Sequence, residues 1–344
     1  MKLLWLAFGI LSVLNGTCQS GPGNTSPKTK SKATKTTSGK LENTLLWQIS
    51  GNGLANPSYL FGTMHLLCAD DARLSVNLKK AIKETDRIYF EIDMDDMSQM
   101  MSALKHVRMN DNTKLSDLLS KEEYDRVKLF FEKNGSMLPF SMMERFKPYM
   151  LTSLIGERSM GCEQTNGMEM SIMQEAKKYD KEILGLETAE FQAGLFDSIP
   201  YEKQAKELLN YIDSIHHFKN NTSDLAKVYR EQNLEKMQQL TASESGIGEY
   251  LDLLVYDRNR RWVEQLSTIL AKNSTLIAVG AGHLPGEEGM INLLRKAGYT
   301  VKPLKNTPPP PPNPPSSRRS SMLSLWRKSS SRMRSVLVSD RSLT

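Results

Sequence analysis

The chain has 344 residues, enough for a sizeable hydrophobic core and for one or two domains. Its formal net charge of +6 is concentrated at the two ends, since residues 1–40 carry six Lys and no acid and residues 307–344 carry seven Lys or Arg and one acid. Subtracting these leaves 32 bases and 38 acids for residues 41–306, a net charge of −6. A mildly acidic central region argues against a nucleic-acid groove, where a basic face is expected.

Residues 1–18 are typical of a secretory signal peptide. Lys2 precedes an apolar run at 3–14 that is too short to span a bilayer comfortably, and small residues follow up to Cys18. We therefore expect an extracytoplasmic protein: secreted, periplasmic or on the cell surface. A lipoprotein anchored through Cys18 and an uncleaved anchor helix are alternatives, but residues 15–17 depart from the usual lipobox, which favours ordinary cleavage.

Both flanking segments have compositions that are typical of disorder. Residues 19–40 are Ser, Thr, Gly and Lys with scarcely an apolar side chain, which predicts a flexible leader. Residues 307–315 hold seven prolines and predict a polyproline-II spacer. The Ser/Arg-rich residues 316–344 predict a disordered, solvated tail, with weak contact to a membrane surface as the alternative.

Residues 41–306 predict a single α/β domain. Hydrophobic periodicity and helix-boundary residues predict, in chain order, a strand at 59–61, a helix at 74–85, a strand at 87–93, a helix at 120–134 behind a Ser120/Glu123 capping box, a helix from Ser141, a helix at 168–179, a strand at 182–186, a helical stretch at 201–272, a strand at 275–279, a helix at 287–297 and a strand at 299–304. Within the helical stretch we expect breaks near Asn220 and at 246–248. Ser141 with Glu144 repeats the capping-box spacing, and Pro148 interrupts the helical pattern beyond it.

Two short segments at opposite ends of this domain share one pattern. Residues 59–65 and 276–283 are each an apolar run that reaches a Gly and then places a His three positions later, His65 and His283. Ligands of open α/β sheets bind just beyond the carboxyl ends of the strands, so both imidazoles could reach one rim. Imidazole is the commonest protein metal ligand. The alternative is that each His only caps a strand or fills a rim position.

The predicted fold is therefore α/β, with a central mixed sheet built from two Gly-x-x-His-bearing halves and a mainly helical middle insertion. Two cysteines remain after cleavage, Cys68 and Cys162. They could pair in an oxidising compartment. Cys68 could instead be a thiolate ligand, although a small buried apolar role is favoured.

Two glutamates belong to apolar strands. Glu91 lies within the predicted strand at 87–93, and Glu187 follows the one at 182–186. A buried carboxylate needs a partner or a metal ion. Together with His65 and His283 these carboxylates suit a divalent metal with an open water position, and a Glu could then act as general base. An exposed edge position or a buried ion pair is the alternative for Glu91.

The charged run at 257–262 would by default be a solvated helix face. Arg258 and Arg261 nevertheless fall on one face, and one of them could pair with a site carboxylate or stabilise an oxyanion. Glu169, in the turn that enters the helix at 168–179, is a weaker candidate.

The chain resembles the TraB/GumN family, whose animal relatives are the Tiki proteases. The resemblance covers about residues 44–305 and rests on motifs in order: Leu60-Phe61-Gly62-Thr63-Met64-His65, Tyr89-Phe90-Glu91-Ile92-Asp93, Leu184-Gly185-Leu186-Glu187-Thr188 with Gln192, Asp257-Arg258-Asn259, and Val279-Gly280-Ala281-Gly282-His283 through Gly289, then Leu294 and Gly298-Tyr299-Thr300-Val301.

The resemblance implies an active site of His65, His283, Glu91 and Arg258. It also implies a metal-dependent peptidase with a divalent ion such as manganese or cobalt. Many relatives have Asp where this chain has Glu169, one methylene longer, which leaves the role of Glu169 open.

These observations lead to one main hypothesis and two alternatives. The main hypothesis is an exported metal-dependent hydrolase acting on peptides or proteins, with His65, His283 and Glu91 as metal ligands and Glu91, Arg258 and Glu187 as catalytic residues. The first alternative is a non-catalytic metal- or haem-binding protein that uses the same histidines. The second is a surface-interaction protein with a vestigial site, which the full retention of the site residues disfavours.

Overall fold

A computed structural model describes residues 41–135, 138–159, 162, 164–243 and 248–309. The predicted signal peptide, the leader and nearly all of the tail lie outside the described residues. In the part of the chain that is described, no helix has the length and apolar character needed to cross a membrane.

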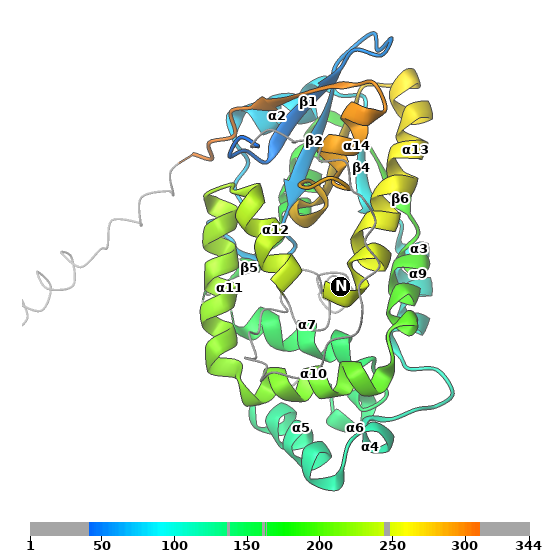
Figure 1. Cartoon of the computed structure of the whole chain (residues 1–344), viewed down its shortest axis with the longest axis vertical. Helices are drawn as coiled ribbons and strands as arrows, with labels where there is room; N and C mark the ends of the chain where they lie inside the picture. The colour runs from blue at the N-terminus through cyan, green and yellow to red at the C-terminus, as the bar shows by residue number, and fades with distance from the viewer. Residues whose placement is uncertain (1–40, 136–137, 160–161, 163, 244–247, 310–344) are drawn as a thin grey trace, which may run out of the picture. The chain divides into compact units, whose positions relative to one another are not determined.

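A six-stranded mixed sheet lies at the centre, with the strand order β6-β4-β7-β2-β1-β8 (Figure 1). The strands are β1 (Leu46–Ser50), β2 (Ser58–Thr63), β4 (Arg87–Ile92), β6 (Glu182–Glu187), β7 (Thr275–Gly280) and β8 (Thr300–Leu304). Four of them, β6, β4, β7 and β2, run parallel, and β1 pairs antiparallel with both β2 and β8. The predicted mixed sheet is therefore confirmed. Strand β1 is not among the predicted elements, although Trp47-Gln48-Ile49-Ser50 alternates apolar and polar residues as a half-buried strand does.

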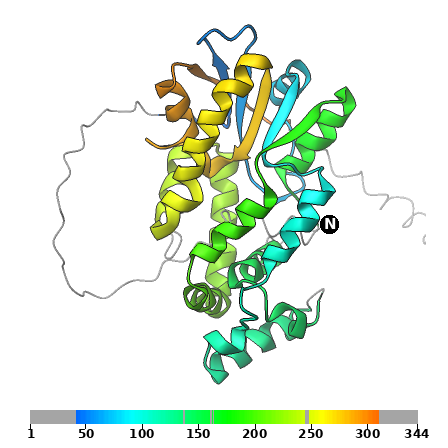
Figure 2. The same ribbon diagram turned by 90° about the vertical axis from the view of Figure 1, so that its right-hand side faces the viewer.

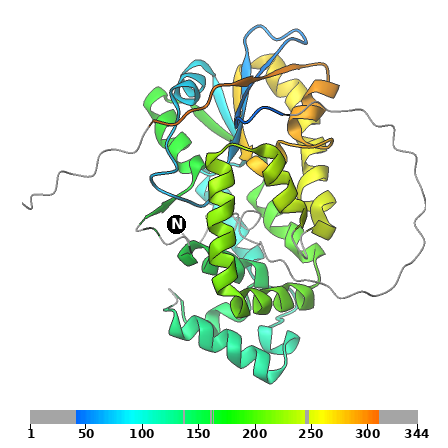
Figure 3. The same cartoon turned by 60° about the vertical axis from the view of Figure 1, so that its left-hand side comes forward.

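Helices make up most of the connections between the strands. They are α2 (Val76–Glu84), α3 (Met97–Ala103), α4 (Leu115–Leu118), α5 (Lys121–Lys133), α6 (Phe140–Met143), α7 (Pro148–Ser159), α8 (Met168–Ala176), α9 (Ala189–Gly194), α10 (Tyr201–Asp213), α11 (Ile215–Arg230), α12 (Leu234–Ser243), α13 (Asp257–Lys272) and α14 (Met290–Lys296). The helical middle lies at the carboxyl-end side of the sheet, where α7 packs on α10 and α11 rises from α10 toward β2 (Figure 3). A small ribbon of β3 (Leu67–Cys68) and β5 (Thr165–Asn166) joins the two parts.

The order of the strands explains where a crevice forms. From β2 the chain crosses through α2 to β4 and through α8 to β6, then reverses through α13 to β7 and through α14 to β8. Because such crossovers are right-handed, the reversal puts α2 and α8 on one face of the sheet and α13 and α14 on the other (Figure 2). The connections after β2 and β7 therefore leave toward opposite faces, which opens a crevice at their carboxyl ends.

The helix predicted from Ser141 and its Glu144 capping box is wrong. Ser141 lies inside the short α6, and the Glu144 carboxylate instead accepts a hydrogen bond of 3.0 Å from the hydroxyl of Tyr124. The next helix, α7, begins at Pro148. Proline suits a first helical position because its fixed φ is helical and the missing N–H has no partner there.

Other helix boundaries match the sequence patterns to different degrees. The capping box of Ser120 and Glu123 forms as predicted at the start of α5. The predicted break near Asn220 is wrong, because α11 continues through that position and the chain turns at Ser214. Residues 244–247 lie outside the described part of the chain, so the break expected at 246–248 is tested only at its last residue.

Removing both ends of the chain should leave the domain folded. We expect residues 41–309 alone to melt cooperatively and within a few degrees of the mature protein, as followed by circular dichroism. The cut should not fall before Thr307, because Asn306 is buried and donates to the side chain of Gln232 at 3.0 Å. A loss of more than about 2 kcal/mol in the free energy of unfolding, which is large for a domain, would show that an end segment packs on the fold.

Candidate active site

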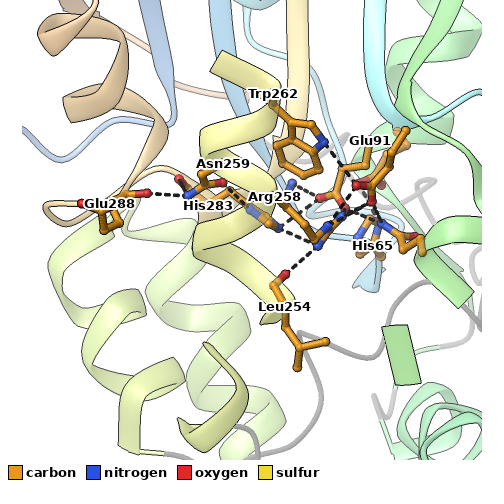
Figure 4. Close-up of polar contacts among 12 residues, drawn as sticks. His65, Glu91, Leu254, Arg258, Asn259, Trp262, His283 and Glu288 are labelled. Atoms are coloured by element: carbon orange, nitrogen blue, oxygen red, sulfur yellow. Dashed lines mark hydrogen bonds and ion pairs between the residues drawn. The ribbon is translucent and has the colours of Figure 1, made fainter. Parts of the chain in front are cut away.

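Three strands deliver polar side chains to the crevice. His65 follows β2, Glu91 lies one residue before the end of β4, and His283 follows β7. Strands β2 and β7 are parallel neighbours in which Thr63 pairs with Gly280, so the predicted adjacency of the two Gly-x-x-His segments is confirmed. His65, Glu91 and His283 line one pocket (Figure 4).

The pocket is small and has one apolar wall. Its volume is about 50 Å³, which is room for a few water molecules rather than for a substrate residue. Leu225, Met237 and Val255, from the helical middle, form the apolar wall. The hydroxyl of Tyr229, in the last turn of α11, donates to the Gly62 carbonyl at 2.9 Å and ties this wall to β2.

Arg258 contacts both site glutamates and His283. Its side chain is fully buried in the first turn of α13. The guanidinium donates from Nη2 to Glu91 at 2.5 Å and to Glu187 at 2.6 Å, and from Nε to Glu187 at 3.0 Å. Nη1 donates to the Leu254 carbonyl at 2.8 Å and lies 3.2 Å from Nε2 of His283. All five N–H groups therefore have partners, so in this arrangement Arg258 neutralises carboxylates and has no donor left for a substrate oxyanion.

The two site glutamates differ in their surroundings. Burial alone would raise the pKa of Glu91, but the Arg258 guanidinium holds that pKa well below its usual range. Burial raises the pKa of Glu187 in spite of the same guanidinium. Glu187 does not line the pocket, and its contacts with Arg258 and Gln192 connect it to Glu91.

The backbone of Gly280 completes the surroundings of Glu91. Its N–H donates to Oε1 of Glu91 at 2.8 Å. A Cβ at this position would lie 3.1 Å from the same oxygen, closer than most real contacts, so the residue at the end of β7 has to be small. Gly280, the Gly of the second Gly-x-x-His segment, therefore donates a backbone hydrogen bond to the carboxylate of Glu91 on the neighbouring strand β4.

His65 is held by the carboxylate of Glu169, at 2.8 Å from Nδ1. Burial alone would lower the pKa of His65, but Glu169 raises it to about 9. Gly167 lets α8 approach, because a Cβ there would lie 2.7 Å from the His65 carbonyl oxygen. The disulfide between Cys68 and Cys162, left open by the sequence, joins the segment after His65 to the segment before α8.

His283 has a neutral partner at Nδ1. Its Nδ1 lies 2.7 Å from Oδ1 of Asn259, and its ring centroid lies 4.7 Å from that of Trp262. Burial lowers the pKa of His283 to about 3. The two histidines of the repeated segment are thus held differently, His65 by a carboxylate and His283 by an amide.

Three residues in the site were assigned no role from the sequence. Trp262 stacks on Arg258 with 4.6 Å between the guanidinium carbon and the ring, and its indole N–H donates to Glu187 at 3.3 Å. Gln192 donates to Glu91 at 2.8 Å, and Asn259 contacts His283. The available signals were the family motifs, which include Gln192 and Asn259, and the helical spacing that puts Arg258 and Trp262 on the same face of α13.

The pocket offers the donor types that a divalent ion prefers. Two imidazoles and a carboxylate are a common ligand set with open positions. However, no three His, Cys, Asp or Glu side chains among the described residues are gathered closely enough to hold a metal ion. Glu91 and His283 both contact Arg258 instead. The donor set fits a metal ion in its chemistry, and binding would require His65 to lose a proton and the contact between Arg258 and Nε2 of His283 to open.

Comparison with known proteins places this fold in a family. The model of the TraB/PrgY/gumN family matches residues 45–303. The chain belongs to this family. The match spans the domain from β1 to the last strand and includes every residue that lines the pocket. No solved structure matches the chain.

Curated relatives of this TraB/PrgY/gumN protein include two named groups. Metalloprotease TIKI2 of Danio rerio is 24% identical over 325 residues, which cover 78% of this chain and 62% of the relative. A metalloprotease TIKI homolog of Amphimedon queenslandica is 26% identical, over 77% of this chain and 62% of the relative. The uncharacterized protein YbaP of Escherichia coli (strain K12) is 25% identical, over 69% of this chain and 87% of the relative. The matches to the first two relatives therefore span less than two thirds of their length.

Proposed function

We propose that this protein is an exported, metal-dependent hydrolase that cleaves peptides or proteins. The observation that carries the proposal is the convergence of two imidazoles and one carboxylate, from the ends of three parallel strands, on a single buried pocket. The names of the Tiki relatives as metalloproteases support the reaction class.

In this proposal His65, His283 and Glu91 hold the ion, which the family resemblance suggests is manganese or cobalt. Such an ion lowers the pKa of a bound water and polarises a carbonyl. The contacts of Arg258 keep Glu91 ionised, as a ligand must be. Leu225, Met237 and Val255 give the same pocket an apolar wall, and a surrounding of low polarity strengthens the electrostatic interactions inside it.

Arg258 and Glu187 act on the reaction through Glu91 and do not contact the substrate. Arg258 bridges the two carboxylates, and Glu187 also accepts from the indole of Trp262. Their proposed role is electrostatic: they set the charge and the position of Glu91, which is the carboxylate that faces the pocket.

Export remains part of the proposal. It rests on the signal-like residues 1–18 and agrees with the disulfide between Cys68 and Cys162, which forms in oxidising compartments. The partner is a peptide or protein substrate, with weak membrane-surface contact of the basic tail as an additional proposal.

A non-catalytic metal-binding protein is the second candidate, since the same ligands would hold an ion without turnover. Haem is disfavoured, because a pocket of about 50 Å³ is far smaller than the roughly 300–1,000 Å³ of sites for large cofactors. Turnover separates the remaining two candidates.

Replacing either histidine by glutamine should abolish hydrolysis. The test uses the mature protein with Mn²⁺ or Co²⁺ and a library of quenched fluorescent peptides. We expect His65→Gln and His283→Gln to reduce turnover by at least about 100-fold, the usual range for loss of an acid–base or ligand group. Glutamine is chosen because alanine would leave Glu169 buried without a partner.

His106→Gln is the matched control. His106 pairs with the exposed Glu190 at 3.0 Å, away from the pocket, and its replacement should leave turnover unchanged. A chelator should stop the reaction and added metal should restore it. Metal binding without cleavage of any peptide would favour the non-catalytic candidate, and full activity of the His283 variant would exclude the proposed site.

A further inference from the structure

Asn259 is buried beside His283, and its amide has one orientation. The side chain is fully buried in the first turn of α13. Its Nδ2 donates to the Glu288 carbonyl at 2.7 Å and to the His283 carbonyl at 3.2 Å (Figure 4). Because two carbonyl oxygens can only accept, the nitrogen must face them and the amide oxygen must face the imidazole.

That orientation determines where the proton of His283 lies. Oδ1 of Asn259 has no proton to donate, so Nδ1 of His283, at 2.7 Å, has to be the N–H that donates to it. On the other side of the ring, Nε2 lies 3.2 Å from Nη1 of Arg258, and a guanidinium has no acceptor atom. Nε2 must therefore carry the lone pair. Two independent neighbours, both on α13, require the same tautomer.

We propose that Asn259 is a positioning residue that fixes His283 in the Nδ1–H tautomer, with the lone pair of Nε2 accepting from Nη1 of Arg258. Nε2 also lies 3.7 Å from Oε1 of Glu91, and His283 lines the pocket, so a ligand that displaces the Arg258 contact would meet a lone pair and not an N–H at this atom. The inference concerns the state of the free protein and holds whether the pocket serves hydrolysis or metal binding alone.

His65 provides an internal comparison. Its Nδ1 lies 2.8 Å from the Glu169 carboxylate, which is also an acceptor. Both imidazoles thus turn Nδ1 toward an acceptor. The partner differs in charge, so the amide of Asn259 fixes the tautomer of His283 without adding a buried negative charge beside Glu91.

The experiment is a long-range ¹H–¹⁵N spectrum of the mature protein labelled with ¹⁵N-histidine, recorded near neutral pH without metal. The His283→Gln variant identifies the His283 signals by their loss. We expect the wild-type spectrum to show a protonated Nδ1 and an unprotonated Nε2 for His283. A protonated Nε2 in the wild-type protein would overturn the inference directly, and this arm needs no variant of Asn259 to fold.

Two replacements separate positioning from a purely structural role. Asn259→Asp keeps an oxygen for Nδ1 but loses the two N–H donors, so the Nδ1–H tautomer should persist. Asn259→Leu keeps the approximate volume and loses the acceptor, so only the longer contact of Arg258 at 3.2 Å still favours the lone pair at Nε2, and a measurable fraction of the Nε2–H tautomer should appear. Where turnover is measurable, we expect a loss of about 10–100-fold for the leucine variant and substantial recovery in the aspartate variant. An unchanged tautomer in the leucine variant, or equal loss of the tautomer in both, would overturn the inference. Absence of peptide cleavage would affect only the proposed function.

Discussion

Replacing Arg258 by methionine is expected to lower the free energy of unfolding by about 3–5 kcal/mol. The guanidinium has no exposed surface, and Glu91 and Glu187 both depend on it for neutralisation. Without it, two buried carboxylates face each other with no opposite charge between them. Urea denaturation followed by circular dichroism measures the change, and activity should be lost as well.

The control for this prediction lies two residues further along the same helix. Arg260 makes its ion pairs with Asp257 and Glu288 at the surface, so Arg260→Met should cost at most about 1 kcal/mol. Adding Glu187→Gln to the Arg258 variant should recover part of the stability, because one of the two unpaired charges is removed. If Arg258→Met proved as mild as Arg260→Met, the buried charge cluster would not exist in solution.

Removing the disulfide is expected to lower the free energy of unfolding by about 2–4 kcal/mol. Cys68 and Cys162 are separated by 94 residues of sequence, and the disulfide closes this segment into a loop. Without the bond the unfolded chain gains conformational entropy, which lowers the stability of the folded state. The bond lies beside the two-stranded ribbon of β3 and β5. Because that ribbon brings α8 to His65, we also expect the Glu169 contact to loosen and turnover to fall.

The double replacement Cys68→Ser with Cys162→Ser should be compared with wild-type protein in dithiothreitol. Both should show the same lower stability, and the reductant should have no further effect on the double variant. Equal stability of oxidised wild-type protein and the double variant would mean that the two cysteines do not pair.

Local patterns were sufficient to predict the elements that carry the site. Apolar runs predicted β2, β4, β6 and β7 within about two residues, because the strands of a parallel sheet covered by helices are mostly apolar. The Glu144 capping box did not form: Ser141 lies inside α6, and the Glu144 carboxylate accepts from Tyr124, 20 residues away.

The pairing of β2 with β7 brings the two histidines together, and contacts from other elements set the pKa and the hydrogen bonds of each one. The Gly-x-x-His pattern indicated two strand ends with imidazoles, and parallel pairing of β2 with β7 made them neighbours. Nothing in the two segments distinguishes His65 from His283. Their difference comes from Glu169 on α8 and from Asn259 on α13.

Hydrophobic periodicity and glycine positions are local properties, so they were enough to predict the α/β class, most strands of the sheet and the polar residues at their carboxyl ends. The charge state of each polar group depended on tertiary packing. Arg258 reaches Glu91 across 167 residues of sequence and the Glu187 carboxylate across 71. Protonation and tautomer depend on burial and on hydrogen-bond partners within a few ångströms, and such partners are brought together by packing of α8, α9 and α13 on the sheet.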